Sequence, residues 1–266
     1  MFKDILKSLK ETDWYLAILT LPVVGAGLVT MISFSGPNTL FVKQLTWAII
    51  SLLVFFIVSQ FDVRVLKRTE ILVGLFGFFS LLLVALFILG HTAKGAQSWF
   101  SLGSFSFQPS DFMKIIVILM LAKYFSRRHV EIAHFKHIVV SGVYALVPFV
   151  LVFLQPDFGS AMVIFMIWFG MALVAGISKR HLLLLGLLGV VAFGALWLFI
   201  FKPYQKDRIM NFIHPYSDIR GSGYNVYQAG IAVGSGKILG KGIGFGTQSR
   251  LQFLPEYQTD FIFAAF

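Results

Sequence analysis

The sequence predicts an all-α fold, a polytopic bundle of membrane-spanning helices formed by a single domain over residues 1–266. Three observations support this prediction, and two of them come from the composition. Of all residues, 58% are hydrophobic and only 13% are charged, whereas soluble proteins have about 25% charged residues. The third is a series of apolar runs close to the roughly 20 residues with which a helix crosses a membrane. The seven runs cover residues 15–34, 45–61, 71–90, 112–125, 138–154, 158–177 and 182–201.

The first and fourth runs need separate justification. The first is too long for the apolar core of a signal peptide, and a second run follows within about ten residues, so we expect it to stay as a span. The fourth run is short and contains Lys114. It predicts a re-entrant segment, a tilted helix or a helix packed wholly within the bundle.

Basic residues between the runs predict the orientation. Only Lys43 and Lys94 flank one side of the predicted membrane. By the positive-inside rule, the side with more Lys and Arg is cytoplasmic, which places the N-terminus there and residues 202–260 in a large extracytoplasmic loop. Twelve residues mark the cytoplasmic side: Lys3, Lys7, Lys10, Arg64, Lys67, Arg68, Lys123, Arg127, Arg128, Lys136, Lys179 and Arg180.

Several classes of protein are excluded or disfavoured. The net charge of +10 is explained by membrane topology, so we expect no nucleic acid as partner. Cysteine is absent, which excludes disulfides, thiolate zinc sites and cysteine nucleophiles. No window fits a nucleotide-binding phosphate loop. The histidines at 129, 134 and 137 fall in a basic cytoplasmic loop, where we expect them to be solvated rather than bound to metal.

The predicted outer loop is rich in glycine, with nine glycines between Gly221 and Gly246. Glycine permits tight turns and close backbone approach, which predicts either a flexible or re-entrant loop or one that cradles a ligand headgroup. Seven basic and four acidic residues give the loop a charge of +3. This excess favours an anionic ligand, although a surface facing lipid headgroups would explain it equally.

Polar residues beside apolar runs are the candidate functional groups, because charge near hydrocarbon is costly. Each also has a structural interpretation. Trp99 could be an interfacial anchor, and Asp157 and Asp260 could cap helices. Asp111 and Lys114, one helical turn apart, could simply pair. The topology predicts one shared outer surface for Trp99, Asp111, Lys114, Asp157, Glu256 and Asp260.

Four motifs resemble the SEDS family of shape, elongation, division and sporulation proteins, and the last is closer to the rod-shape member than to the division member. They are GAQSW at 95–99, QPSDFMK at 108–114, QPDFGSA at 155–161 and the stretch from GYNVYQAG at 223 to TDFIFAAF at 266. The resemblance implies a membrane peptidoglycan glycosyltransferase that polymerises lipid II outside the bacterial cytoplasmic membrane. It also implies ten membrane helices, so we expect this chain to be a fragment or a truncated homologue.

The resemblance assigns roles to individual residues. The family's essential aspartate falls at Asp260, which we expect to act as general base on the acceptor hydroxyl, a role suited to a carboxylate desolvated at the membrane surface. Anionic undecaprenyl pyrophosphate is the leaving group, and nearby cations would stabilise it. The residues expected to bind substrate are Trp99, Asp111, Lys114, Lys241, Arg250 and Glu256.

Three motifs depart from the family pattern, at five positions in all. Gln97 and Ser98 replace two arginines before the tryptophan, so any headgroup contact from those arginines is missing. Asp111 is shorter than the usual glutamate. Tyr257 and Gln258 replace Ala and His, so no histidine stands beside Asp260.

Two other functions are consistent with the sequence: a lipid II flippase, and a non-catalytic scaffold for a class B penicillin-binding protein. The resemblance implies three partners, namely lipid II, a class B penicillin-binding transpeptidase and membrane lipids. The sequence indicates no certain cofactor and leaves open a divalent cation.

Overall fold

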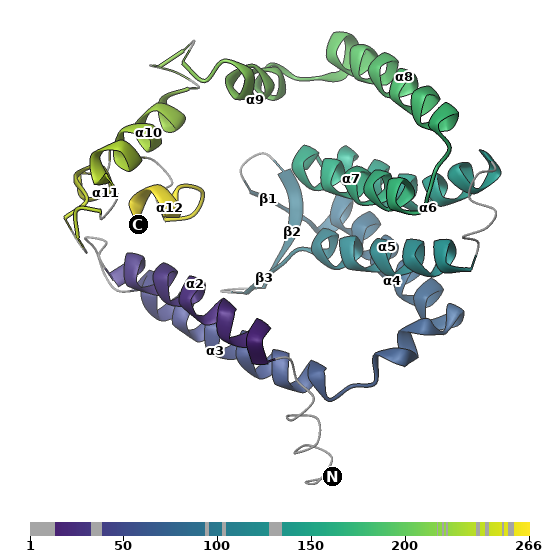
Figure 1. Cartoon of the computed structure of the whole chain (residues 1–266), viewed down its shortest axis with the longest axis horizontal. Coiled ribbons are helices and arrows are strands. Elements are labelled where there is room, and N and C mark those ends of the chain that lie inside the picture. Colours follow the sequence, from purple (N-terminus) through teal and green to yellow (C-terminus); the bar gives the residue numbers. More distant parts are fainter. Residues whose placement is uncertain are drawn as a thin grey trace. The chain divides into compact units, whose positions relative to one another are not determined.

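The computed structural model describes residues 14–32, 39–93, 96–102, 105–127, 135–216, 218–219, 221, 223–237, 240–242, 245–251, 253–254 and 258–266. Figure 1 draws the chain in colours that follow the sequence. The chain forms two compact units. The middle of the sequence, Asp62–Phe193, is the central unit, and the terminal unit combines Met1–Phe61 with Gly194–Phe266. Each of the seven predicted apolar runs overlaps a helix.

Four packed helices form the core of the central unit. They are α4 (Thr69–Leu89), α5 (Pro109–Ser126), α6 (Phe135–Leu154) and α7 (Phe158–Val174). The 3-10 helix η1 (Val63–Lys67) precedes α4, and α8 (Lys179–Ala195) follows α7. Gly176 has a φ of 94°, a conformation that favours glycine and ends helices, just after α7. The fully buried core residues include Leu83, Leu86, Met113, Leu121, Val152 and Ile164.

Helices α6 and α7 approach closely where Gly142 faces Trp168. A Cβ at residue 142 would lie 3.4 Å from the indole ring, so glycine leaves room for the tryptophan. The Trp168 Nε1–H donates a hydrogen bond to Ser141 Oγ at 3.1 Å. This contact satisfies the only polar atom of a side chain that is otherwise packed in the core.

The segment between α4 and α5 is a three-stranded antiparallel sheet, in the order β1 (His91–Ala93), β2 (Ala96–Leu102), β3 (Phe105–Phe107). The predominantly helical fold is as predicted, and this sheet is an addition that the sequence analysis missed. A usable signal is the alternation of serine and phenylalanine over residues 104–107. The ring of Phe107 packs on Phe112 of α5, which stacks on Phe79 of α4, so the sheet is attached to both helices.

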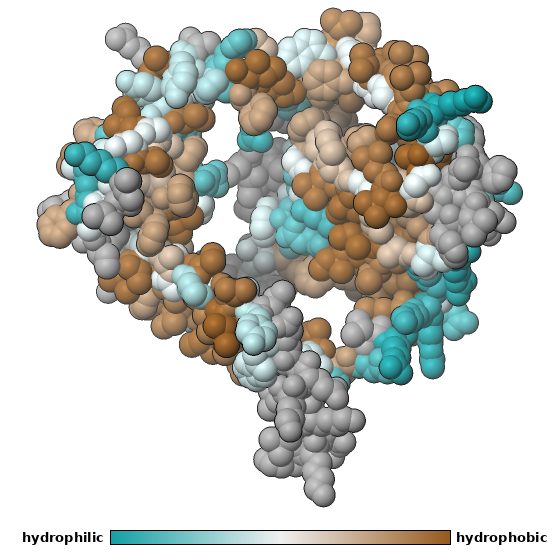
Figure 2. Space-filling view, viewed as in Figure 1, coloured by the Kyte–Doolittle hydropathy of each residue, from teal (hydrophilic) through white to brown (hydrophobic). Residues whose placement is uncertain are grey.

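Basic residues gather where α4 begins and α5 ends. The Lys123 ammonium, near the end of α5, donates hydrogen bonds to the Lys67 carbonyl and the Thr69 hydroxyl. Figure 2 shows hydrophilic surface over η1 and the start of α4 beside the brown hydrophobic surface of the helices. The exposed residues Arg64, Lys67 and Arg68 belong to this surface.

His137 is 5% exposed, so the expectation that it is solvated was wrong. Its Nδ1 shares a hydrogen bond with the Tyr124 hydroxyl at 2.8 Å. The residue lies within α6 rather than in the preceding loop, because the helix begins at Phe135. The other two histidines of this prediction, at positions 129 and 134, lie outside the described residues.

The terminal unit contains α2 (Trp14–Ile32) packed against α3 (Thr39–Ser59). The π-helical turn η2 (Leu196–Ile200) continues from α8. Residues 202–260, expected to be a loop, include α9 (Pro203–Ile213), α10 (Tyr224–Gly236) and α11 (Thr247–Arg250). The short α12 (Ile262–Ala265) contacts α10 and α2.

Helix α10 differs from the expected glycine-rich loop. Glycine disfavours a helix by about 1 kcal/mol relative to alanine, which is why the sequence predicted turns at Gly230, Gly234 and Gly236. These glycines nevertheless lie within α10, which packs on α11 and α12. Tertiary packing therefore outweighs the local preference.

Four helices are long and apolar enough to cross a membrane, judged by length and composition within the described residues. They are Leu40–Ser59, Thr69–Leu89, Lys136–Leu154 and Lys179–Ile200. Shorter apolar helices cover Ile18–Ile32 and Phe158–Val174. The chain is thus a multi-pass membrane protein, and the full count of seven spans stays a prediction.

Candidate functional site

Asp111 and Lys114 lie at the start of α5. Pro109 begins this helix, a favoured position because proline has no N–H to leave unpaired there. Asp111 lies in the first turn, where the positive end of the helix dipole stabilises a carboxylate. The Lys114 Nζ is 2.9 Å from Asp111 Oδ1, with side-chain exposures of 22% and 57%. The predicted pairing is therefore present, and more than half of the Asp111 side chain stays accessible.

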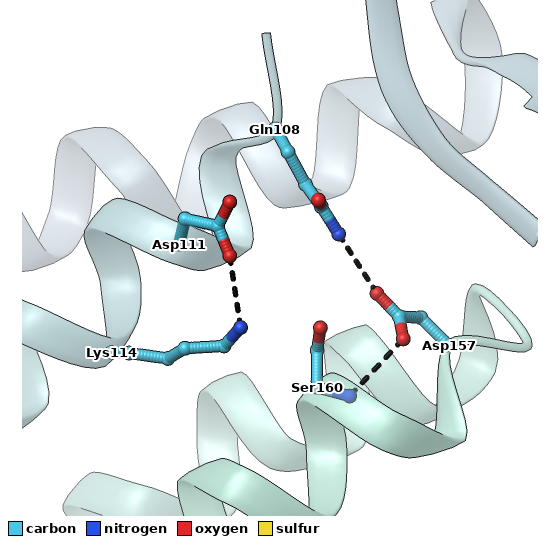
Figure 3. Close-up of polar contacts among 5 residues, drawn as sticks. All are labelled: Gln108, Asp111, Lys114, Asp157 and Ser160. Atoms are coloured by element: carbon cyan, nitrogen blue, oxygen red, sulfur yellow. Dashed lines mark hydrogen bonds and ion pairs between the residues drawn. The ribbon is translucent and has the colours of Figure 1, made fainter. Parts of the chain in front are cut away.

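Asp157 caps the start of α7 and also reaches α5. Its Oδ1 accepts a hydrogen bond from the Ser160 N–H at 3.1 Å, which confirms the N-cap interpretation. Its Oδ2 accepts a second hydrogen bond from Gln108 Nε2 at 3.0 Å. Figure 3 shows this contact beside the Asp111–Lys114 pair. The starts of α5 and α7 are thus joined side by side.

Gln155, two residues before Asp157, makes a separate contact in the core. The side chain is 1% exposed, and its Nε2 donates a hydrogen bond of 2.7 Å to the Leu83 carbonyl of α4. Gln108 and Gln155 were not singled out from the sequence. A usable signal exists, since a Gln-Pro pair stands where α5 begins and another just before α7, at 108–109 and 155–156.

Trp99 lies in the middle of the sheet, in β2, and is half-buried. Its backbone pairs in register with His91 of β1. The neighbouring Ser98, which stands where the resembling family has arginine, is 2% exposed. Because β2 packs against α4 and α5, Trp99 belongs to the same unit as Asp111 and Lys114.

Asp260 belongs to the terminal unit and precedes α12. The residue at the cap of α12 is Phe261, and no side chain caps this helix, so the capping interpretation of Asp260 was wrong. Asp260 is exposed, and within the described residues its carboxylate makes no hydrogen bond or ion pair. Its side chain is therefore accessible to solvent.

The remaining predicted residues belong to the terminal unit too. The Lys241 ammonium donates a hydrogen bond to Thr247 Oγ1 at 3.2 Å. Arg250 is the last residue of α11, and Glu256 lies outside the described residues. The structure therefore brings Asp111 and Lys114 together in one unit and holds Asp260, Lys241 and Arg250 in the other.

A tight turn in residues 202–260 explains two of the glycines. The Gly221 N–H donates to Asp218 Oδ1 at 3.0 Å, and the Gly223 N–H donates to the Asp218 carbonyl at 3.0 Å. A Cβ at Gly223 would lie 2.6 Å from the Pro215 carbonyl oxygen. Glycine is required here by close backbone approach, as the sequence suggested for this loop.

The described residues offer acid–base and charge chemistry. They contain no group of three or more His, Cys, Asp or Glu that could hold a metal ion. An exposed carboxylate can accept a proton from a bound hydroxyl, and the ammonium groups of Lys114 and Lys241 can bind an anion.

Known proteins have related sequences. Residues 13–266 match the cell cycle protein family of FtsW, RodA and SpoVE. Stage V sporulation protein E of Bacillus subtilis (strain 168) is 35% identical over 264 residues, which cover 95% of this chain and 71% of that protein. Peptidoglycan glycosyltransferase MrdB of Escherichia coli (strain K12) is 41% identical over 184 residues, or 69% of this chain. The match spans only 50% of the length of MrdB.

A solved structure shares the fold. It comes from a peptidoglycan synthase complex that coordinates polymerisation and crosslinking, and it superposes with a TM-score of 0.72 at 32% identity. The superposition covers 83% of this chain and 65% of the solved chain. The family match spans both units described above. The chain therefore belongs to the FtsW, RodA and SpoVE family of cell cycle proteins, the family that its motifs indicate.

Proposed function

We propose that this protein is a peptidoglycan glycosyltransferase that polymerises lipid II into glycan strands during cell elongation and the maintenance of rod shape. The observation that carries the proposal is the family match together with the 41% identity to a relative named peptidoglycan glycosyltransferase. The exposed Asp260 supports it, because the carboxylate is not used for capping a helix.

In the proposed reaction, the acceptor's sugar 4-hydroxyl attacks the anomeric carbon of a lipid-linked donor. A new C–O bond forms, the bond to pyrophosphate breaks, and undecaprenyl pyrophosphate leaves with the bonding electrons. Asp260 takes the hydroxyl proton as general base, which contributes about 10²–10⁴-fold in such reactions. Because its side chain is exposed, the bound substrate and the membrane have to supply the desolvation that we expect.

Cationic groups would stabilise the departing pyrophosphate. Lys114 is the best supported, because its ammonium is held by Asp111 and only 22% of its side chain is exposed, which strengthens electrostatic interactions. Lys241 and Arg250 are further candidates within residues 202–260. We assign Trp99, Asp111 and Glu256 to the binding of the sugar and peptide parts of the substrate.

We also propose a cytoplasmic N-terminus and an extracytoplasmic active face. The described basic residues near the start of α4 and the end of α5 support this orientation, because Asp111 lies at the opposite end of α5, beside Asp157. The proposed partner is a class B penicillin-binding transpeptidase. The solved relative from a complex of polymerisation and crosslinking supports this partnership.

The test is lipid II polymerisation by the purified protein with its transpeptidase, beside the Asp260→Asn variant. Asp207→Asn is a matched control, since Asp207 is an exposed carboxylate of α9. We expect glycan strands from the parent and the control but not from Asp260→Asn. Strands from none of the three, with all proteins folded and paired, would reject the proposal and favour transport or scaffolding.

A further inference from the structure

Gln108, Gln155 and Asp157, which we call the helix junction, connect four helices through three side chains. Gln155 follows α6 and binds the Leu83 carbonyl of α4. Two residues later, Asp157 caps α7 and accepts a hydrogen bond from Gln108, which precedes α5. A hydrogen bond between partly buried groups is stronger than one in water. The junction therefore joins α4, α5, α6 and α7 near one end of the bundle.

The Asp157 carboxylate is the central group of this junction, because it uses its two oxygens for different helices. Oδ1 serves the backbone of α7 and Oδ2 serves the side chain before α5 (Figure 3). A cap needs only one acceptor. The second hydrogen bond therefore adds a link between helices that the cap alone does not require.

We propose that Gln108 and Asp157 are positioning residues, which fix the start of α5 against α7 and thereby hold Asp111 and Lys114 in place for the substrate. The inference rests on the proposed function. Asp111 lies three residues after Gln108, in the first turn of α5, and Lys114 lies one turn further. A shift of the helix start would move both groups, and a displacement of about 1 Å can cost roughly 100-fold in rate.

The chemistry of the two side chains allows the link to be broken and restored. The Gln108→Glu substitution would bring two carboxylates together, with no donor between them and with like charges opposed. Adding Asp157→Asn to this variant supplies a donor again. The Nδ2 of the new asparagine can donate to the new carboxylate, while its Oδ1 still caps α7. The double variant also restores the original net charge of the pair.

The test compares Gln108→Glu with the double variant Gln108→Glu/Asp157→Asn in lipid II polymerisation with the transpeptidase present. The single variant is expected to lose about 10–100-fold in kcat/KM. KM should rise because Asp111 binds substrate, and kcat should fall because Lys114 stabilises the leaving group. The double variant should return to within about threefold of the parent. A double variant as poor as the single one would overturn the proposal.

A matched control separates positioning from general stability. Ser141→Ala removes the buried interhelical hydrogen bond from Trp168, also between side chains of the helix bundle. We expect it to lower the melting temperature without changing KM. If Ser141→Ala raises KM as much as Gln108→Glu at equal loss of melting temperature, the effect is one of stability and the proposal fails.

Hydrogen exchange provides a test that does not need enzyme activity. Gln108→Glu should speed amide exchange in the first turns of α5, residues 110–116, and the double variant should restore the protection. If the parent polymerises no lipid II, the proposed function fails, while this exchange result still decides whether the link holds the helix. Unchanged exchange in Gln108→Glu would overturn the positioning role.

Discussion

The helix junction and the segment around Asp260 present their carboxylates in opposite ways. At the junction, Asp157 makes two hydrogen bonds, and nearby Asp111 is paired with Lys114. Asp260 is exposed and makes no hydrogen bond or ion pair with the described residues. The protein thus holds Asp111 and Asp157 by its own contacts, whereas the carboxylate of Asp260, the proposed base, is exposed.

The largest expected effect comes from Asp260→Asn. Its polymerisation rate should fall by about 10²–10⁴-fold, the usual contribution of a general base. The melting temperature should stay close to that of the parent, because exposed substitutions typically change stability by no more than about 0.5 kcal/mol. Thermal melting in detergent beside the polymerisation assay checks both. A marked loss of stability would show that Asp260 has a structural contact, which would erase the contrast with the junction.

A second prediction concerns the packing of α6 against α7 away from the junction. Gly142→Leu should destabilise the central unit by about 1–3 kcal/mol through overpacking, because even a Cβ there would lie 3.4 Å from Trp168. Gly170→Leu, in α7, is the matched control, since a Cβ added at this glycine would meet no atom within 4 Å. Melting temperatures compare the two variants. Equal losses at both sites would contradict the close α6–α7 contact.

The third prediction tests order within residues 202–260. Gly223→Ala should cost about 1–3 kcal/mol, because the new Cβ would lie 2.6 Å from the Pro215 carbonyl oxygen and 2.9 Å from that of Asp218. Gly234→Ala, inside α10 and with open space at its Cβ, should be neutral or stabilise the helix by up to about 1 kcal/mol. Limited proteolysis and the melting temperature measure the stability of both variants. If Gly223→Ala is harmless, this turn is less fixed than the junction.

The smallest expected effect is that of Ser141→Ala. The change removes one hydrogen bond to Trp168, for which about 0.5–1.5 kcal/mol is typical. Melting of Ser141→Ala beside Trp168→Phe and the double variant gives the coupling between the two side chains. Fully additive losses of stability in the double variant would mean that this contact contributes nothing to the stability of the central unit.

Much of the helical architecture could be predicted from the sequence. The apolar runs indicated the helices because a span must satisfy its backbone polar groups within itself, which is a local requirement. The sheet around Trp99 was not predicted, since its strands are short and depend on packing through Phe107 and Phe112. The burial of His137 was not predicted for a similar reason, because its partner Tyr124 lies on another helix.

The candidate site was predicted only in part. The pairing of Asp111 with Lys114 followed from spacing along one helix, and the cap at Asp157 followed from its place before α7. The contact of Asp157 with Gln108 spans 49 residues of sequence, and no local pattern contains it. The helices within residues 202–260 were also not expected, because packing rather than glycine content determined that α10 is helical.

By itself, the sequence determined the membrane class, the positions of the long apolar helices and the family, since these depend on composition, apolar length and motifs. The tertiary structure decided which helix ends meet and which polar groups are paired. The physical reason is that hydrogen bonds between helices depend on how the helices pack, whereas hydrophobic spans and capping depend on residues that are neighbours in the chain.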